Sequence, residues 1–208
     1  GAGSDLGAGY LTLPQTWDMT HKRFYNLMFN SCSQLESVNL TSFITGYIDR
    51  YLIYGTDPNS SWGVGLYDMF SDCPKLKTVK FEGLGIDAYG MWWNASFGRN
   101  ASLERVEFKN TKRCVWSSSS NMFYQSPKLS YLDLRGVTEL YAGVYVNNWF
   151  NGANCIATKG SNGTAISPTP ATIYVGKIPL DNGFFGQRNT NGTYSYVMNA
   201  NTKIYVEG

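Results

Sequence analysis

The sequence has few charged side chains and no long hydrophobic run, and each shortage excludes a class of function. Only 15% of the 208 residues are charged, against about 25% in an average globular domain. The net charge of +2 argues against a protein that holds nucleic acid by electrostatic attraction to phosphates. No apolar stretch approaches the roughly 18 residues that a membrane-spanning helix needs, so we expect no transmembrane segment.

Histidine is also scarce, which argues against nucleophilic catalysis and zinc binding. His21 is the only histidine, and Lys22 and Arg23 follow it, a context typical of a solvated side chain. A Ser–His or Cys–His catalytic pair needs a base that a third group orients, and the sequence suggests no such partner. The four cysteines are spaced 41 residues apart, which fits no zinc motif. We therefore expect no catalytic residue, no metal and no cofactor.

What the sequence does contain is a repeated motif: an aromatic anchor, a short polar turn, and then Leu-x-x-hydrophobic-x-hydrophobic. The anchors recur at intervals of 41, 27, 26 and 27 residues, at Phe29, Phe70, Phe97, Phe123 and Phe150. Leucines follow with matching spacing, at Leu35, Leu76, Leu103 and Leu129. A fixed period of roughly 20–29 residues is the signature of leucine-rich-repeat solenoids.

The longer intervals indicate insertions into the repeat. The first 41-residue step equals one period plus 14 residues, and the turn-rich run at residues 55–61 is the predicted loop. A second 41-residue step leads from Leu132 to Ile173, with a loop predicted at residues 159–164. Counting back one 27-residue period from Val38 predicts a strand at residues 10–13, and the second 41-residue step predicts one at residues 172–175. A last strand is expected at residues 203–206.

Each Leu-x-x-hydrophobic-x-hydrophobic segment predicts a strand whose apolar side chains point into a shared core while the residues between them point out. Parallel strands stacked about 4.8 Å apart would align these outward residues in columns across the sheet. The columns contain Ser37, Thr78, Arg105 and Tyr131; Asn39, Lys80, Glu107 and Asp133; and Thr41, Glu82, Lys109 and Arg135. Because opposite charges lie near one another, we expect a solvated, ion-paired face.

The pattern Met-Phe-x-x-Cys-x-x-Leu-x-x-Val at residues 28–38 and 69–79 resembles the BspA-like leucine-rich repeats of bacterial surface proteins. Residues 122–134 have Ser126 in place of the cysteine, and residues 97–108 lack both the methionine and the cysteine. The resemblance covers most of residues 10–176. It implies an exported or surface-anchored protein, since several members act as adhesins, and it supplies no catalytic residue. Residues 1–5 are typical of a start from which a targeting segment has been removed.

Cys32 and Cys73 occupy equivalent positions, three residues after their phenylalanines, whereas Cys114 and Cys155 do not. Cysteine is often a small buried hydrophobe, and we favour this interpretation for all four. A disulfide between Cys32 and Cys73 of neighbouring repeats is the alternative.

The outward columns supply the candidate binding residues Lys80, Arg105, Glu107, Tyr131 and Asp133. Two of these, Glu107 and Asp133, would lie on adjacent strands, where two carboxylates could approach the roughly 5–5.5 Å separation of a retaining glycosidase. Cations surround the pair in sequence, and a flat sheet lacks the enclosed cleft that an acid catalyst needs. Catalysis is therefore the least favoured of the functions considered.

Tryptophans precede the phenylalanine anchors by four to eight residues, at Trp62, Trp92, Trp93 and Trp116. They would either fill wide coils or form an exposed platform, since planar aromatics stack on sugars and anchor protein interfaces. Trp62 is the best single candidate because it lies beside the predicted insertion, and loops carry function disproportionately.

Together these patterns predict one domain over residues 1–208: a right-handed leucine-rich-repeat solenoid with a parallel sheet on one side and loops, short strands or helical turns on the other. Repeats would cover residues 10–176, and residues 177–208 would form a C-terminal cap that shields the last coil. The leading functional hypothesis is a non-enzymatic, adhesin-like module, monomeric and outside the cell, that holds a host or bacterial surface protein or a glycan. The alternative is a structural spacer without a ligand, and a glycan-processing enzyme is the third possibility.

Overall fold

The computed structural model of the chain describes a set of segments that are separate along the sequence. The described residues are 10–12, 27–41, 68–82, 88–92, 96–109, 114–118, 121–136, 139–140, 149–150, 152–153, 155–159, 170–176, 196–199 and 201–207. Within them the regular structure consists of β-strands. The predicted loop at residues 55–61 lies outside the described residues. The predicted loop at residues 159–164 begins inside a strand, at Lys159, and its remainder also lies outside them.

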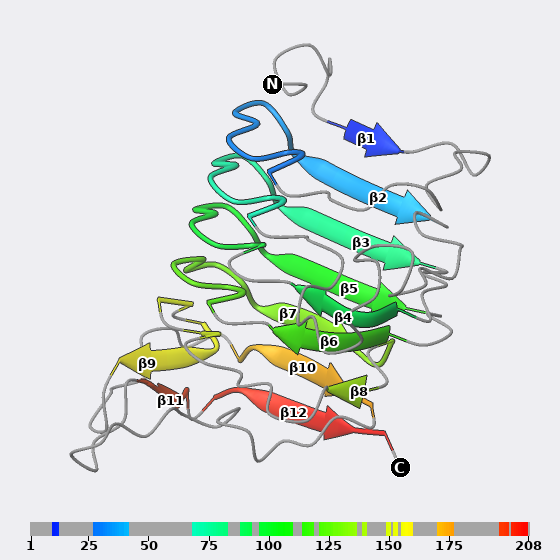
Figure 1. Ribbon diagram of the computed structural model, residues 1–208. Coiled ribbons are helices and arrows are strands. Elements are labelled where there is room, and N and C mark those ends of the chain that lie inside the picture. Colours follow the sequence, from blue (N-terminus) through cyan, green and yellow to red (C-terminus); the bar gives the residue numbers. More distant parts are fainter. Residues whose placement is uncertain are drawn as a thin grey trace.

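The main element is a seven-stranded parallel sheet with the order β1-β2-β3-β5-β7-β10-β12 (Figure 1). Its strands are β1 (Tyr10–Thr12), β2 (Ser37–Thr41), β3 (Thr78–Glu82), β5 (Arg105–Lys109), β7 (Tyr131–Leu134), β10 (Thr172–Val175) and β12 (Lys203–Val206). The strands predicted at both ends of the chain and at residues 172–175 are confirmed. Because each repeat contributes one strand beside the strand of the preceding repeat, the fold is a repeat-like parallel sheet.

Shorter strands lie in the return segments between the strands of the main sheet. β4 (Ala88–Trp92), β6 (Cys114–Ser118) and β8 (Glu139–Leu140) form a second parallel sheet. β9 (Ala157–Lys159) and β11 (Tyr196–Met198) pair antiparallel near the end of the chain. Residues 177–208, predicted to form a cap, therefore contribute β11 to this pair and β12 to the edge of the main sheet.

The register of the main sheet reproduces the columns expected from the sequence. Ser37, Thr78, Arg105 and Tyr131 are aligned from β2 to β7. The second column aligns Asn39, Lys80, Glu107 and Asp133 in the same way. The residues between these positions, such as Val79 and Val106, are fully buried, so one face of the sheet faces the core and the other faces outward.

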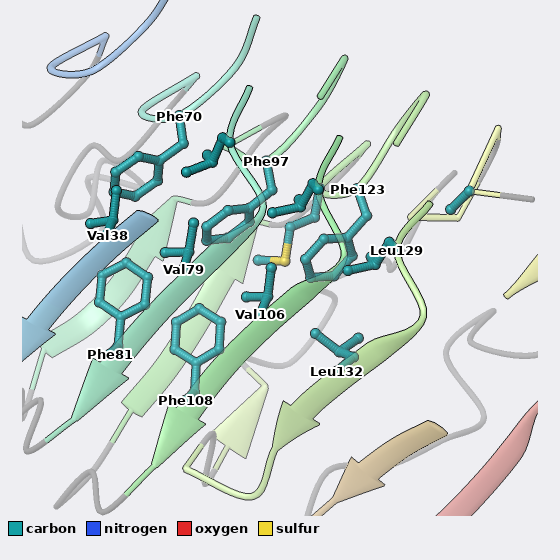
Figure 2. Close-up of a cluster of buried hydrophobic side chains, with 14 of the residues drawn as sticks. Val38, Phe70, Val79, Phe81, Phe97, Val106, Phe108, Phe123, Leu129 and Leu132 are labelled. Atoms are coloured by element: carbon teal, nitrogen blue, oxygen red, sulfur yellow. The ribbon is translucent and has the colours of Figure 1, made fainter. Parts of the chain in front are cut away.

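The phenylalanine anchors form a continuous stack behind the sheet (Figure 2). The ring centroids of Phe29, Phe70, Phe97, Phe123 and Phe150 are successively 5.3, 5.7, 5.5 and 5.8 Å apart, and their planes are nearly parallel. Phe81 and Phe108 form a second stack, with a centroid distance of 4.8 Å, that meets Phe97 edge-on. Burial of these large rings is the main favourable term available to the fold, because the hydrophobic effect scales with the apolar area removed from water.

The turn after each anchor adopts the same left-handed backbone conformation. The second residue after each phenylalanine has a φ between 52° and 83°, at Ser31, Asp72, Arg99, Gln125 and Gly152. Side chains other than glycine adopt this conformation at a cost of about 1–2 kcal/mol. At Gly152 a Cβ atom would also lie 3.0 Å from the Cα of Gln125. Glycine therefore relieves strain and allows the close approach of two neighbouring turns at this position.

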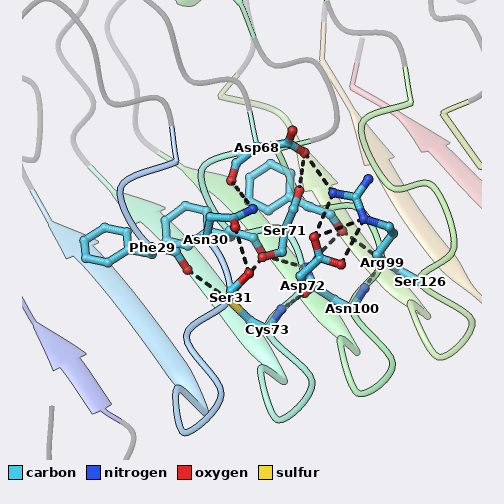
Figure 3. A network of polar contacts seen from close by, with 12 residues as sticks. Phe29, Asn30, Ser31, Asp68, Ser71, Asp72, Cys73, Arg99, Asn100 and Ser126 are labelled. Atoms are coloured by element: carbon cyan, nitrogen blue, oxygen red, sulfur yellow. Dashed lines mark hydrogen bonds and ion pairs between the residues drawn. The ribbon is translucent and has the colours of Figure 1, made fainter. Parts of the chain in front are cut away.

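The third residue after the anchor links successive repeats (Figure 3). The thiol of Cys73 donates a hydrogen bond to the carbonyl oxygen of Phe29, at 3.1 Å. In the next repeats Asn100 donates to the carbonyl of Phe70 at 2.9 Å, and Ser126 donates to that of Phe97 at 2.8 Å. These three side chains thus place a small buried donor at this position, whereas the repeat anchored by Phe150 has the buried Ala153 there, which has no side-chain donor.

Cys32 and Cys73 are buried, as predicted, and both are free thiols. The alternative, a disulfide between them, is wrong for this structure, because the Cys73 thiol is used as a hydrogen-bond donor to a backbone oxygen. Cys155 is also a free thiol but is only half-buried, and the side chain of Cys114 lies outside the described residues.

Candidate functional site

The most distinctive surface feature of the described residues is a row of arginine and tyrosine side chains on the outer face of the sheet. The row crosses β5, β7, β10 and β12, and we call it the arginine–tyrosine ladder: Arg105, Tyr131, Arg135, Tyr174 and Tyr205. Alternation along each strand places these side chains opposite the buried core positions. The tyrosines of β10 and β12 are aligned in the sheet register, in the column of Asp133.

The ladder is continuous because each member contacts the next. The guanidinium carbon of Arg105 lies 3.5 Å from the ring centroid of Tyr131, which is a close cation–π contact. The rings of Tyr131 and Tyr174 are 5.7 Å apart, and those of Tyr174 and Tyr205 are 5.1 Å apart and nearly parallel. Arg135 adds a second guanidinium, 4.7 Å from the Tyr174 ring. The contacts hold four successive strands together on their outer face.

Two carboxylates lie beneath the arginines: the expected ion pairing is confirmed, but the expectation that these groups are solvated was wrong. Glu107 and Asp133 were predicted to be solvated, but they are only 5% and 0% exposed. The reason is local pairing. Arg105 Nε donates a hydrogen bond to Glu107, and Arg135 donates to both oxygens of Asp133, at 3.0 and 2.6 Å. A buried charge is tolerated when it is paired in this way.

The pairing fixes the direction of both guanidinium groups. The hydrogen bonds and charge of Asp133 raise the pKa of the Arg135 guanidinium, so this arginine stays charged. About 40% of each arginine side chain is exposed to solvent. Arg105 pairs through Nε alone, which leaves its two amino groups outside this ion pair. A ligand at this surface would therefore meet preoriented cationic donors.

The structure also shows the surroundings of the two carboxylates that the catalytic hypothesis paired, Glu107 and Asp133. They are aligned on the adjacent strands β5 and β7, as expected. Both are buried and hydrogen-bonded to arginines of their own chain segments. Their role in the structure is to orient Arg105 and Arg135.

The other predicted site residues have different outcomes. Lys80 is half-buried on β3, and it is aligned with Glu107 on the outer face. Trp62 lies outside the described residues, and so do the side chains of Trp92 and Trp116. Tyr174 and Tyr205 were missed, although extending the outward column across the predicted strands at residues 172–175 and 203–206 would have found them.

A second polar cluster joins the turns that precede β3 and β5, and it holds neighbouring repeats together (Figure 3). Arg99 donates to both carboxylate oxygens of Asp72, at distances between 2.8 and 3.1 Å, and reaches Asp68 at 3.4 Å. The hydrogen bonds to Asp72 are the main reason why the pKa of the Arg99 guanidinium is raised. Ser71 completes the cluster with a 2.7 Å hydrogen bond to Asp68. The cluster connects neighbouring repeats, as Asn100 and Ser126 do in the interior.

Within the described segments, no group of three or more histidine, cysteine, aspartate or glutamate side chains could hold a metal ion. The same segments contain no helix with the length and apolar character needed to cross a bilayer. The chain was also compared with protein-family models, with curated proteins and with solved structures. None of the three comparisons found a match, so no family assignment follows from them.

Proposed function

We propose that the chain is a right-handed leucine-rich-repeat solenoid, similar to the BspA-like repeats, that serves as a non-enzymatic binding module of an exported or cell-surface protein. The repeat period, the parallel sheet with one strand per repeat and the stacked anchors support the solenoid assignment. The role is adhesin-like: the module holds a partner on the outer face of its sheet.

The observation that carries this proposal is the arginine–tyrosine ladder. Tyrosine and arginine are enriched among the residues that dominate binding energy at protein interfaces. Here they are held on strands rather than loops, and their orientation is fixed by buried carboxylates and ring contacts. Such preorganisation lowers the entropic cost of binding. A spacer module would have no need for a rigid, partly exposed surface of this composition.

A protein partner fits the ladder better than a glycan. Sugars bind aromatic residues by stacking on an open ring face. The faces of Tyr131 and Tyr174 are instead directed toward a guanidinium or a neighbouring ring. What these rings offer is their edges, alongside arginine donors that match the carboxylates of an acidic protein surface.

The test is a binding screen of the labelled protein against extracellular proteins, mucins and bacterial glycans. The ladder variant combines Tyr131→Thr with Tyr174→Thr, which removes two rings and leaves both ion pairs intact. The matched control combines Asn39→Ala with Thr78→Ala, which changes the same two columns on β2 and β3. We expect a protein ligand that is retained by the control and lost by the ladder variant.

The other outcomes distinguish the alternatives. If a glycan is retained by the control and lost by the ladder variant, the ladder remains the binding site but its ligand is a glycan and not a protein. Binding that survives in the ladder variant and is lost on Trp62→Ala would move the site to the inserted loop. If the protein binds nothing in the screen, the spacer hypothesis is supported, and if it hydrolyses a glycan, the enzyme hypothesis is supported.

A further inference from the structure

β12 is an edge strand of the main sheet. It pairs with β10 on one side, and none of the described residues pairs with its other side. Its four residues are exposed or half-buried, unlike the alternating pattern of β10. Natural proteins usually protect such an edge with charges, proline or a bulge, because unpaired backbone groups are a template for another strand. β12 has only Lys203 for this purpose.

Side chains of β12 are also exposed on both faces of the sheet. On the inner face Val206 is aligned with Val175, which is fully buried, yet Val206 itself is 61% exposed. On the outer face Tyr205 is 49% exposed and ends the arginine–tyrosine ladder. Two of the three exposed large hydrophobic side chains among the described residues therefore lie on this one strand.

The backbone of β12 shows which groups face the open edge. Lys203 N–H donates to the carbonyl of Ala171 at 2.8 Å, and Glu207 N–H donates to that of Val175 at 2.9 Å. Donors alternate in direction along a strand. The N–H and C=O groups of Ile204 and Val206 therefore face away from β10, where a further strand would bond to them.

We infer that a second copy of this chain occupies the edge, through antiparallel pairing of β12 with its symmetry mate about a two-fold axis at Tyr205. The sequence from Lys203 to Glu207 is self-complementary in this register. Lys203 lies opposite Glu207 of the second copy, Ile204 lies opposite Val206, and Tyr205 lies opposite itself. A two-fold interface requires this kind of self-complementarity.

The hydrogen-bonding pattern agrees with the same register. Ile204 and Val206 of the two copies form the hydrogen-bonded pairs, since their backbone groups face the open edge. Tyr205 and its mate then form the non-hydrogen-bonded pair, in which side chains approach most closely. The two ladders meet at these rings, and Val206 gains an apolar neighbour. The inference does not depend on the proposed binding function, because the two ladder tyrosines used to test that function are not at this edge.

The interface is small, so association is weak and depends on concentration. The experiment is sedimentation velocity of the whole chain over about a thousandfold range of concentration. We expect a monomer–dimer equilibrium for the native protein. The single variants Lys203→Glu and Glu207→Lys each place like charges opposite one another at both ends of the paired strands. Each should raise the dissociation constant of the dimer at least tenfold. Lys128→Glu, an exposed charge change on another part of the surface, should leave the dimer unchanged.

A mixture of the two single variants supplies the decisive comparison. One copy then presents glutamate at both positions and the other presents lysine at both, so a heterodimer regains both ion pairs. Hydrogen exchange should also slow at the amides of Ile204 and Val206 on association, whereas those of Lys203 and Glu207 are already bonded to the neighbouring segment. Circular dichroism checks that each variant remains folded.

Three results would overturn the inference. One is a native protein that stays monomeric at the highest concentration. Another is association that continues beyond the dimer, since head-to-tail addition of copies gives open-ended assemblies. The third is a mixture of folded single variants that fails to associate.

Discussion

At the scale of single residues, the third position after the phenylalanine joins neighbouring repeats where it carries a donor, as at Cys73, Asn100 and Ser126. Asn100 makes three buried hydrogen bonds there: it accepts from the backbone N–H of Cys73 at 2.8 Å and donates to two carbonyl oxygens, at 2.9 and 3.1 Å. Removing this side chain takes away the hydrogen bonds to the Cys73 N–H and the Phe70 carbonyl, whereas the Phe97 carbonyl keeps the Ser126 hydroxyl. A buried group left without a partner costs about 1–3 kcal/mol. The polarity of this site is therefore as important as its size.

We predict that Asn100→Ala lowers the free energy of unfolding by about 3 kcal/mol or more, because three buried bonds are lost together. Urea denaturation of the native and variant proteins measures the difference. Asn30→Ala is the control, since Asn30 is half-buried and neither of its side-chain hydrogen bonds is fully buried: a 3.4 Å bond to the backbone of Asp68 and a 2.8 Å bond accepted from the exposed Ser31 hydroxyl. It should cost less than about 1 kcal/mol, and equal losses in the two variants would contradict the assignment.

The Cys73 thiol predicts a pH dependence of stability. Burial raises its pKa to about 12, whereas an unfolded cysteine titrates near 8.5. Above that pH the unfolded chain loses its thiol proton while the folded chain retains it. Stability is thus fully present below about pH 8.5 and declines toward pH 12, by up to about 1.4 kcal/mol per pH unit.

The comparison that isolates this effect is Cys73→Ser, which keeps a hydrogen-bond donor but does not ionise in this range. Denaturation is measured for both proteins at several pH values between 8 and 11. We expect the native protein to lose stability more steeply than the variant as pH rises. Parallel curves would show that the thiol proton does not contribute.

At the scale of elements, the stacked phenylalanines explain why one repeat cannot be changed without effect on its neighbours. Phe97 is fully buried between Phe70 and Phe123, and it also meets the rings of Phe81 and Phe108 edge-on. A cavity at this place cannot collapse easily because rigid rings surround it.

We predict that Phe97→Ala destabilises the protein by about 3–5 kcal/mol, the range found for large aromatic truncations in cores. Phe29→Ala should cost less, since Phe29 is 5% exposed and stacks on a single ring among the described residues. Denaturant titration of both variants gives the ranking. A larger loss at Phe29 would argue against a stack whose stability is greatest at its centre.

One of the buried ion pairs of the outer face makes a prediction for the strand β7. Arg135→Ala leaves the fully buried Asp133 carboxylate without its two side-chain donors. We expect a loss of about 1–3 kcal/mol, or more because the unpaired group is charged. The second change Asp133→Asn should recover part of that loss by removing the buried charge. The explanation would be contradicted if the double variant lost more free energy of unfolding than the two single variants lose when their losses are added.

At the scale of the whole molecule, stability should fall from the centre of the sheet toward its ends. In repeat proteins each unit is stabilised only by its neighbours. The strands β3, β5 and β7 have neighbours on both sides, whereas β1 and β12 each have one. Val206 and Tyr205 at the end of the sheet are also exposed.

Hydrogen exchange at low protein concentration should therefore be slowest in β5 and fastest in β1 and β12, with a graded change between them. Mass spectrometry of peptides from each strand measures this profile. Uniform protection from β1 to β12 would indicate that the sheet opens only as a single cooperative unit.

Much of the fold was predictable because it depends on spacing. The interval between Phe97 and Phe123 and the alternation in Val106-Glu107-Phe108 are properties of the chain itself, and they predicted the strands, their register and the core face. The candidate site was predicted only in part. Arg105 and Tyr131 were identified from the outward column, but Tyr205 was not, because its importance depends on the stack that it completes.

The sequence by itself determined the period, the strand positions and the division between core and outer face, since these follow from side-chain alternation and repetition. Only the tertiary structure decided that Glu107 and Asp133 are buried. Each carboxylate is paired with an arginine two residues away on the same strand segment, and each of these arginines lies against a tyrosine ring of the neighbouring strand. The alternation along the strand places each arginine beside its carboxylate, but the tyrosine contacts join residues of different repeats and depend on the assembled sheet. The tertiary structure also decided that β12 has an open edge, because whether a strand has a second neighbour is a property of the assembled sheet.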